Sequence, residues 1–126
     1  MAQIFMAIAA LLGGTSVAAG AFGSHALRER LSDRATEIFE IATRYQMYHA
    51  LALLLVGILL SRAESAQALL TGSAYAFIVG VVIFSGSLYA LSLSQIKWLG
   101  AVAPLGGLAL MVGWGCLAIA ALNLKG

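Results

Sequence analysis

Residues 98–124 read WLGAVAPLGGLALMVGWGCLAIAALNL, and this stretch contains no Asp, Glu, Lys or Arg. A helix rises ~1.5 Å per residue, so about 20 apolar residues cross the ~30 Å hydrocarbon core of a bilayer. The stretch therefore predicts a membrane-spanning helix. Three further charge-free runs occupy residues 1–27, 45–61 and 65–96.

The composition of the whole chain agrees with this interpretation. Of its 126 residues, 62% are hydrophobic and 10% are charged, against a usual ~45–50% and ~25%. So few charges cannot cover a small soluble domain, and so many apolar residues exclude a disordered chain. Seven scattered Lys and Arg residues are too few to follow a nucleic-acid backbone, so no nucleic-acid partner is expected.

We therefore predict an all-α, polytopic membrane protein, a four-transmembrane-helix bundle that forms a single membrane domain over residues 1–126. The four spans are expected at about 3–24, 45–61, 70–92 and 100–123. The second run reaches only ~25 Å, but it still spans if the arginines at its two ends, Arg44 and Arg62, extend outward.

Loop one carries most of the charge, because residues 28–44 hold eight of the twelve charged residues. Ser32 is a suitable helix N-cap, and Asp33 follows it in the first turn. Helical spacing then aligns one stripe of residues: Ala35, Ile38, Phe39, Ala42 and Tyr45. These features predict an amphipathic helical segment that runs on into span two. A separate interfacial helix is the alternative.

Small residues recur at helical spacing in three of the spans. They are Ser16, Gly20 and Ser24 in span one, Ala76 and Gly80 in span three, and Gly106 and Gly113 in span four. Such small-xxx-small faces allow close helix packing, within one chain or between chains. Span four also contains Pro104, so this helix either begins near the proline or begins earlier and passes through it.

The distribution of Lys and Arg predicts the orientation. Loops one and three share five basic residues (Arg28, Arg30, Arg34, Arg44 and Lys97), whereas the other side has two, Arg62 and Lys125. The positive-inside rule then puts loops one and three in the cytoplasm and both termini outside.

Seven polar side chains are expected at the loop-one face of the membrane: His25, Arg28, Arg44, Tyr45, Gln46, His49 and Tyr89. We expect the two histidines at the same depth. Polar groups in a membrane usually face the bundle interior or a wet cavity. One hypothesis is a polar vestibule that binds an anion, a quinone-like headgroup or protons; the other is a hydrogen-bonded network that locks loop one onto the bundle.

The sequence offers little for catalysis or metal binding. None of the spans contains a carboxylate, and neither a Walker phosphate loop nor an HExxH motif occurs. Two histidines without a nearby carboxylate motif are a poor metal site. We therefore expect no catalytic residues, no metal, no cofactor and no enzymatic activity.

Four stretches carry a family resemblance: residues 20–27 (GAFGSHAL), 44–53 (RYQMYHALAL), 84–89 (FSGSLY) and 98–107 (WLGAVAPLGG). Together they resemble domain-of-unknown-function family 423, which includes the animal transmembrane protein 256. The resemblance implies a small polytopic protein of the bacterial inner membrane, without an assigned activity. It also makes His25 and His49 the motif histidines, and Ser24 stands where alanine is usual.

From these features we expect a non-enzymatic structural or accessory component that packs in the lipid bilayer as a homo-oligomer or in a larger membrane complex. Two alternatives remain: a small transporter or channel that uses the polar vestibule, and a membrane protein that binds a quinone or a lipid.

Overall fold

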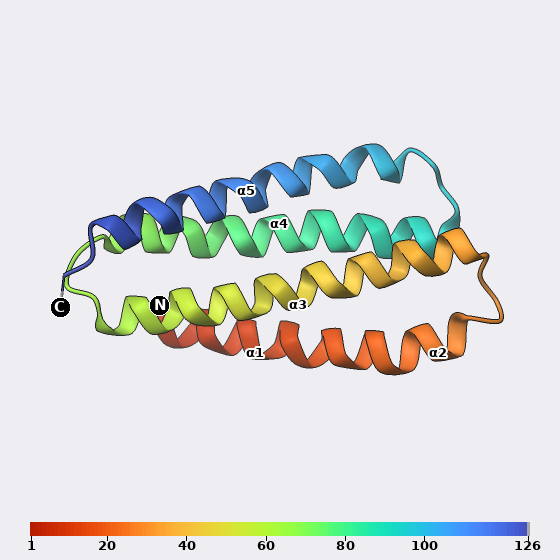
Figure 1. The fold of residues 1–126 in the computed structure, drawn as a ribbon, viewed down its shortest axis with the longest axis horizontal. Helices are drawn as coiled ribbons and strands as arrows, with labels where there is room; N and C mark the ends of the chain where they lie inside the picture. Colours follow the sequence, from red (N-terminus) through yellow and green to blue (C-terminus); the bar gives the residue numbers. More distant parts are fainter. Residues whose placement is uncertain (126) are drawn as a thin grey trace.

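The structure, a computed structural model that describes residues 1–125, consists of helices joined by short turns. The elements in chain order are α1 (Ala2–Ala18), the π-helical turn η1 (Ala19–Gly23), α2 (Ser24–Leu27), α3 (Asp33–Arg62), α4 (Gln67–Ser94) and α5 (Leu99–Leu122). Figure 1 shows the long helices side by side. Both termini lie at one end, and the α2–α3 and α4–α5 turns lie at the other.

Four helical segments are long and apolar enough to cross a membrane: 2–27, 33–62, 67–94 and 99–122. The first comprises α1, η1 and α2 as one continuous helical stretch. The predicted all-α, four-span architecture is confirmed. Each helical segment extends beyond its predicted span, except at the C-terminal end of α5, which ends at Leu122 and so one residue before the predicted end at 123.

The start of α3 follows from its sequence. The Ser32 hydroxyl accepts a hydrogen bond from the Ala35 backbone N–H at 3.1 Å, which caps the helix. From Asp33 the helix continues without a break to Arg62, so loop one does contain a helical segment that runs into span two, and no separate interfacial helix forms. Three residues of the predicted stripe, Ala35, Phe39 and Ala42, are buried, whereas Ile38 is half-buried and Tyr45 is exposed.

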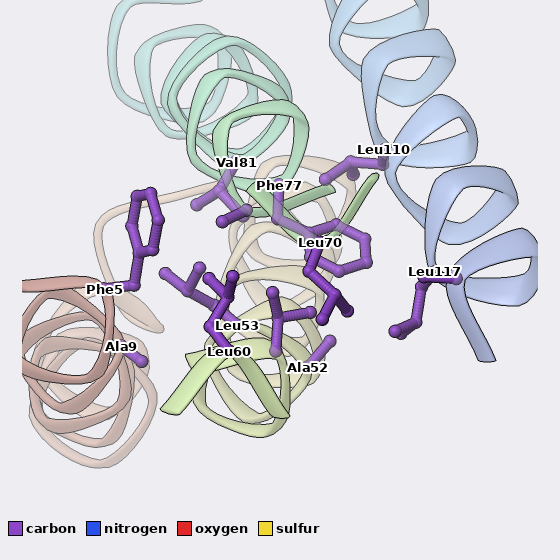
Figure 2. Packing of buried hydrophobic residues seen from close by; sticks show 13 residues of the cluster. Phe5, Ala9, Ala52, Leu53, Leu60, Leu70, Phe77, Val81, Leu110 and Leu117 are labelled. Atoms are coloured by element: carbon purple, nitrogen blue, oxygen red, sulfur yellow. The ribbon is translucent and has the colours of Figure 1, made fainter. Parts of the chain in front are cut away.

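Helices that follow one another in the chain pack together: α1 on α3, α3 on α4, and α4 on α5. Seen along the bundle, α3 and α4 lie between α1 and α5 (Figure 2). The core between them includes Leu53, Val56, Leu70 and Phe77, which are all fully buried. α1 and α5 are therefore the edge helices, and much of their surface faces outward.

Glycines allow α4 and α5 to approach closely. A Cβ added at Gly106 would lie 2.3 Å from the backbone nitrogen of Phe84, and one at Gly113 would lie 2.6 Å from the Phe77 ring. On the opposite helix, a Cβ at Gly80 would lie 2.6 Å from Leu110. These small residues thus serve packing within one chain. The side chain of Ser24 is outside the described part of the structure.

Pro104 lies inside α5, which begins at Leu99, so the helix does not start at the proline. Proline has no N–H to give the carbonyl four residues earlier. The carbonyl of Gly100 therefore lacks its usual helical donor, near the loop-one end of the bundle.

Replacing Gly106 by alanine should destabilise the protein by about 1–3 kcal/mol, because the new methyl group meets the backbone of Phe84 and α5 must shift. Thermal unfolding in mild detergent measures the effect. Gly115→Ala is the matched control, since Gly115 is on the same helix with open space at its Cβ position. Equal unfolding temperatures for the two variants would contradict the close α4–α5 contact.

Candidate functional site

Gln46 joins three helices at one point. Its Nε2 donates to the Leu12 carbonyl and to the Thr15 hydroxyl, both at 2.8 Å, and its Oε1 accepts from the Tyr89 hydroxyl at 2.6 Å. Gln46 is only 6% exposed. We call Thr15, Gln46 and Tyr89 the Gln46 cluster; its hydrogen bonds connect α1, α3 and α4.

Two serines reinforce the same region of α3. The Ser16 hydroxyl on α1 donates to the Thr43 carbonyl at 2.7 Å, and the Ser85 hydroxyl on α4 donates to the Ala42 carbonyl at 2.8 Å. Consecutive carbonyls of α3 therefore accept bonds from the helices on either side. Both serines are buried, so these bonds form away from water.

A second group, the His49 cluster, comprises Tyr45, His49, Phe77 and Trp114. The Trp114 indole donates to His49 Nε2 at 3.0 Å, and His49 Nδ1 lies 2.7 Å from the Tyr45 carbonyl oxygen. An indole N–H can only donate and a carbonyl can only accept. His49 is therefore neutral, with its proton on Nδ1, and both ring nitrogens have partners.

Aromatic rings surround this histidine. The Phe77 ring centroid lies 5.6 Å from that of His49, and the Tyr45 ring stacks against it at 6.1 Å. Phe77 also packs edge-on against Trp114 at 5.1 Å. His49 itself is only 5% exposed. The site is thus an aromatic contact between α3, α4 and α5 with one hydrogen-bonded imidazole inside it.

The structure brings some of the predicted site residues together and separates others. Gln46 meets Tyr89, and Tyr45 meets His49. Arg44 is exposed and pairs with Glu40 at 3.7 Å, as its i,i+4 spacing favours. His25 and Arg28 are exposed at the loop end and belong to neither cluster. The seven residues do not form one vestibule.

The expectation that both histidines lie at one depth is wrong. Gly13 packs against Ala50, next to His49, with 3.9 Å between the Gly13 Cβ position and the Ala50 Cβ. His25 follows Gly13 by twelve residues, or about 18 Å along the helix. The physical reason is that the first helical segment continues through η1 and α2 to Leu27, which carries His25 far past His49.

A groove of about 340 Å³ opens on the surface beside the Gln46 cluster. Its walls come from α1, η1, α3 and α4: Thr15, Ala19, Phe39, Gln46, Tyr89 and Leu93. Among the side chains that the structure describes, every buried nitrogen or oxygen has a hydrogen-bond partner, and no group of three metal-binding side chains occurs. The polar atoms at the groove are thus already engaged within the protein.

Residues 19–107 match the family described as "Protein of unknown function (DUF423)". The chain belongs to this DUF423 family. It is 44% identical over 124 residues to a UPF0382 membrane protein of Staphylococcus epidermidis, covering 98% of this chain and 99% of that protein. It is 36% identical over 121 residues to the UPF0382 membrane protein YwdK of Bacillus subtilis, covering 96% and 98%. No solved structure matches.

The relatives are named as membrane proteins, which agrees with the four apolar helices, so this DUF423 protein is an integral membrane protein of the lipid bilayer. Both relatives come from bacteria, so a location in a bacterial membrane fits this protein. The family resemblance expected from the motifs is confirmed.

Three residues of the two clusters were not predicted from the sequence: Thr15, Phe77 and Trp114. For the two polar ones, Thr15 and Trp114, the sequence did contain a usable signal. A hydroxyl or an indole N–H within an apolar span needs an acceptor, because lipid offers none. Trp114 therefore required a partner on a neighbouring helix, and His49 was one of the few acceptors in the spans.

The hydrogen bonds of His49 predict a neutral imidazole with the proton on Nδ1. Solid-state ¹⁵N NMR of histidine-labelled protein in lipid should show this tautomer. Trp114→Phe should shift the Nε2 resonance and destabilise the protein by about 0.6 kcal/mol. The matched control is Trp98→Phe, an exposed tryptophan at the start of α5. A proton on Nε2 in the unaltered protein would contradict the assignment.

Proposed function

We propose that the protein is a non-enzymatic structural or accessory component of an assembly in the bacterial inner membrane. One observation carries the proposal: the edge helix α1 presents small residues outward. Ala10, Gly14 and Ala18 repeat at i,i+4 and are all exposed, on the face away from buried Phe5 and Ala9.

Small outward residues have a physical use in a membrane. Lipid tails are as apolar as leucine, so burial of apolar area does not drive helices together, and close backbone approach matters more. Open space surrounds the Cβ position of Gly14. A second helix, from another copy or another protein, can therefore approach the backbone of α1 at Gly14.

The interior supports an accessory role over transport. The hydroxyls of Ser16, Ser73 and Ser85 donate to carbonyls of neighbouring helices, and both nitrogens of His49 are engaged. A transporter needs polar groups that exchange partners with its cargo. Here the interior polar groups stabilise contacts between helices, and the groove beside Gln46 opens on the surface of the bundle.

The proposal includes an orientation with loops one and three in the cytoplasm and both termini outside. The α2–α3 and α4–α5 turns lie at one end of the bundle (Figure 1). Together with the first half of α3 they contain five of the seven Lys and Arg residues, and the positive-inside rule puts this end in the cytoplasm. In a Glu29→Cys variant, the new thiol should not react with a membrane-impermeant maleimide in intact cells. Rapid labelling of this thiol from outside would contradict the proposed orientation.

Extraction into lipid particles with styrene–maleic acid copolymer, without detergent, tests the assembly. Chemical cross-linking inside these particles should give a species that migrates above the single 13.1 kDa chain on a denaturing gel. Gly14→Leu should weaken the association by about 1–3 kcal/mol, since the larger side chain blocks close approach. Gly72→Leu is the control, because Gly72 also has open space but lies on α4. A lone monomer, or equal weakening by both variants, would contradict the proposal.

A further inference from the structure

A pocket of about 240 Å³ lies at the end of the bundle that carries both termini. Its lining combines two cations with three apolar side chains: Arg62, Lys125, Leu59, Ala63 and Leu124. Leu59 and Arg62 lie in the last turn of α3, and Ala63 is its C-cap. Leu124 and Lys125 belong to the chain that follows α5. Two basic residues distant in sequence thus face one pocket.

Hydrogen bonds to backbone carbonyls hold the two sides of this pocket together. The Glu64 N–H donates to the Lys125 carbonyl at 3.0 Å, and the Ser65 hydroxyl donates to the Asn123 carbonyl at 2.7 Å. The turn after α3 is itself fixed, because the side-chain amide of Gln67 donates a hydrogen bond to the Ala63 carbonyl at 2.6 Å. The chain after α5 is therefore tied to the α3–α4 turn, and Lys125 is kept near Arg62.

Neither cation forms an ion pair within the described residues. The ion pairs among residues 1–125 join Arg34 with Glu37 and Arg44 with Glu40, both in the first half of α3 at the opposite end of the bundle. Glu64 is the acidic residue of the α3–α4 turn, and it forms no ion pair within this range. Two like charges on one pocket repel each other, so an anion bound between them is stabilised by both.

The position of the pocket indicates which anion it meets. Arg62 ends the charge-free run 45–61 and Lys125 ends the run 98–124, so both lie where the hydrocarbon core gives way to headgroups. Leu59 and Leu124 extend the pocket on its apolar side. Basic pockets of this kind suit the phosphate of an anionic lipid, while the apolar walls suit the start of its acyl chains.

We propose that Arg62 and Lys125 form a binding site for the phosphate-bearing headgroup of an anionic phospholipid, with Leu59 and Leu124 against its acyl chains. The occupant is a membrane lipid and not free phosphate, because the apolar walls contribute only to a ligand with hydrocarbon attached. The site is independent of whether α1 contacts a partner.

Native mass spectrometry of the full chain tests the site with phosphatidylglycerol and phosphatidylcholine as the two probes. The unaltered protein should retain phosphatidylglycerol preferentially. Arg62→Gln and Lys125→Gln should each reduce that preference roughly 5-fold, and the double variant should lose it. The matched control is the double variant Arg28→Gln, Lys97→Gln, which removes two exposed cations at the opposite end and should keep the preference.

Three results would overturn the proposal. They are equal retention of both lipids, an equal loss of preference in the two double variants, and displacement of the lipid by millimolar inorganic phosphate. Unfolding temperatures measured in an uncharged detergent should be the same for all variants, since Arg62 and Lys125 are exposed. This control separates the loss of a lipid site from the loss of the fold.

Discussion

The absence of water from the hydrocarbon core is the constraint on which this structure depends. A polar group there must find its partner on the protein. Gln46 meets the constraint with all its hydrogen-bonding groups in use, toward α1 and α4. The same requirement pairs Trp114 with His49 and the buried serines with backbone carbonyls. Polar side chains thereby fix the register of helices that apolar packing alone would leave free to slide.

Close packing and hydrogen bonding depend on each other along the α4–α5 contact. Gly113 lets the Phe77 ring lie against α5, and at the same level the Ser73 hydroxyl reaches the Gly113 carbonyl at 2.8 Å. A larger residue at position 113 would separate the helices and lengthen that bond. The glycines therefore matter less for their flexibility than for the distance they permit between backbones.

The sequence was informative wherever one local rule decided the outcome. Charge-free runs located the four helices, and Ser32 with Asp33 located the start of α3. The spacing of glycines identified the helices that pack closely. The depth of a residue in the membrane was harder to predict, because an arginine marks where charge begins but not where a helix ends. His25 and His49 were for this reason expected at the same depth. Pairing across the bundle was harder still. The contact between His49 and Trp114 depends on how α5 is rotated about its axis, and no local pattern reports that rotation.

The central claim is that the polar interior stabilises the fold and does not serve a ligand. The most direct test is the free energy of unfolding of Gln46→Met, an apolar replacement of similar length, measured in mild detergent. The claim predicts a loss of about 1–2 kcal/mol, since three hydrogen bonds disappear and the Tyr89 hydroxyl is left without its acceptor. When a residue is kept for function at a cost in stability, its replacement usually leaves the protein equally stable or more stable. An unchanged or more stable Gln46→Met variant would contradict the claim.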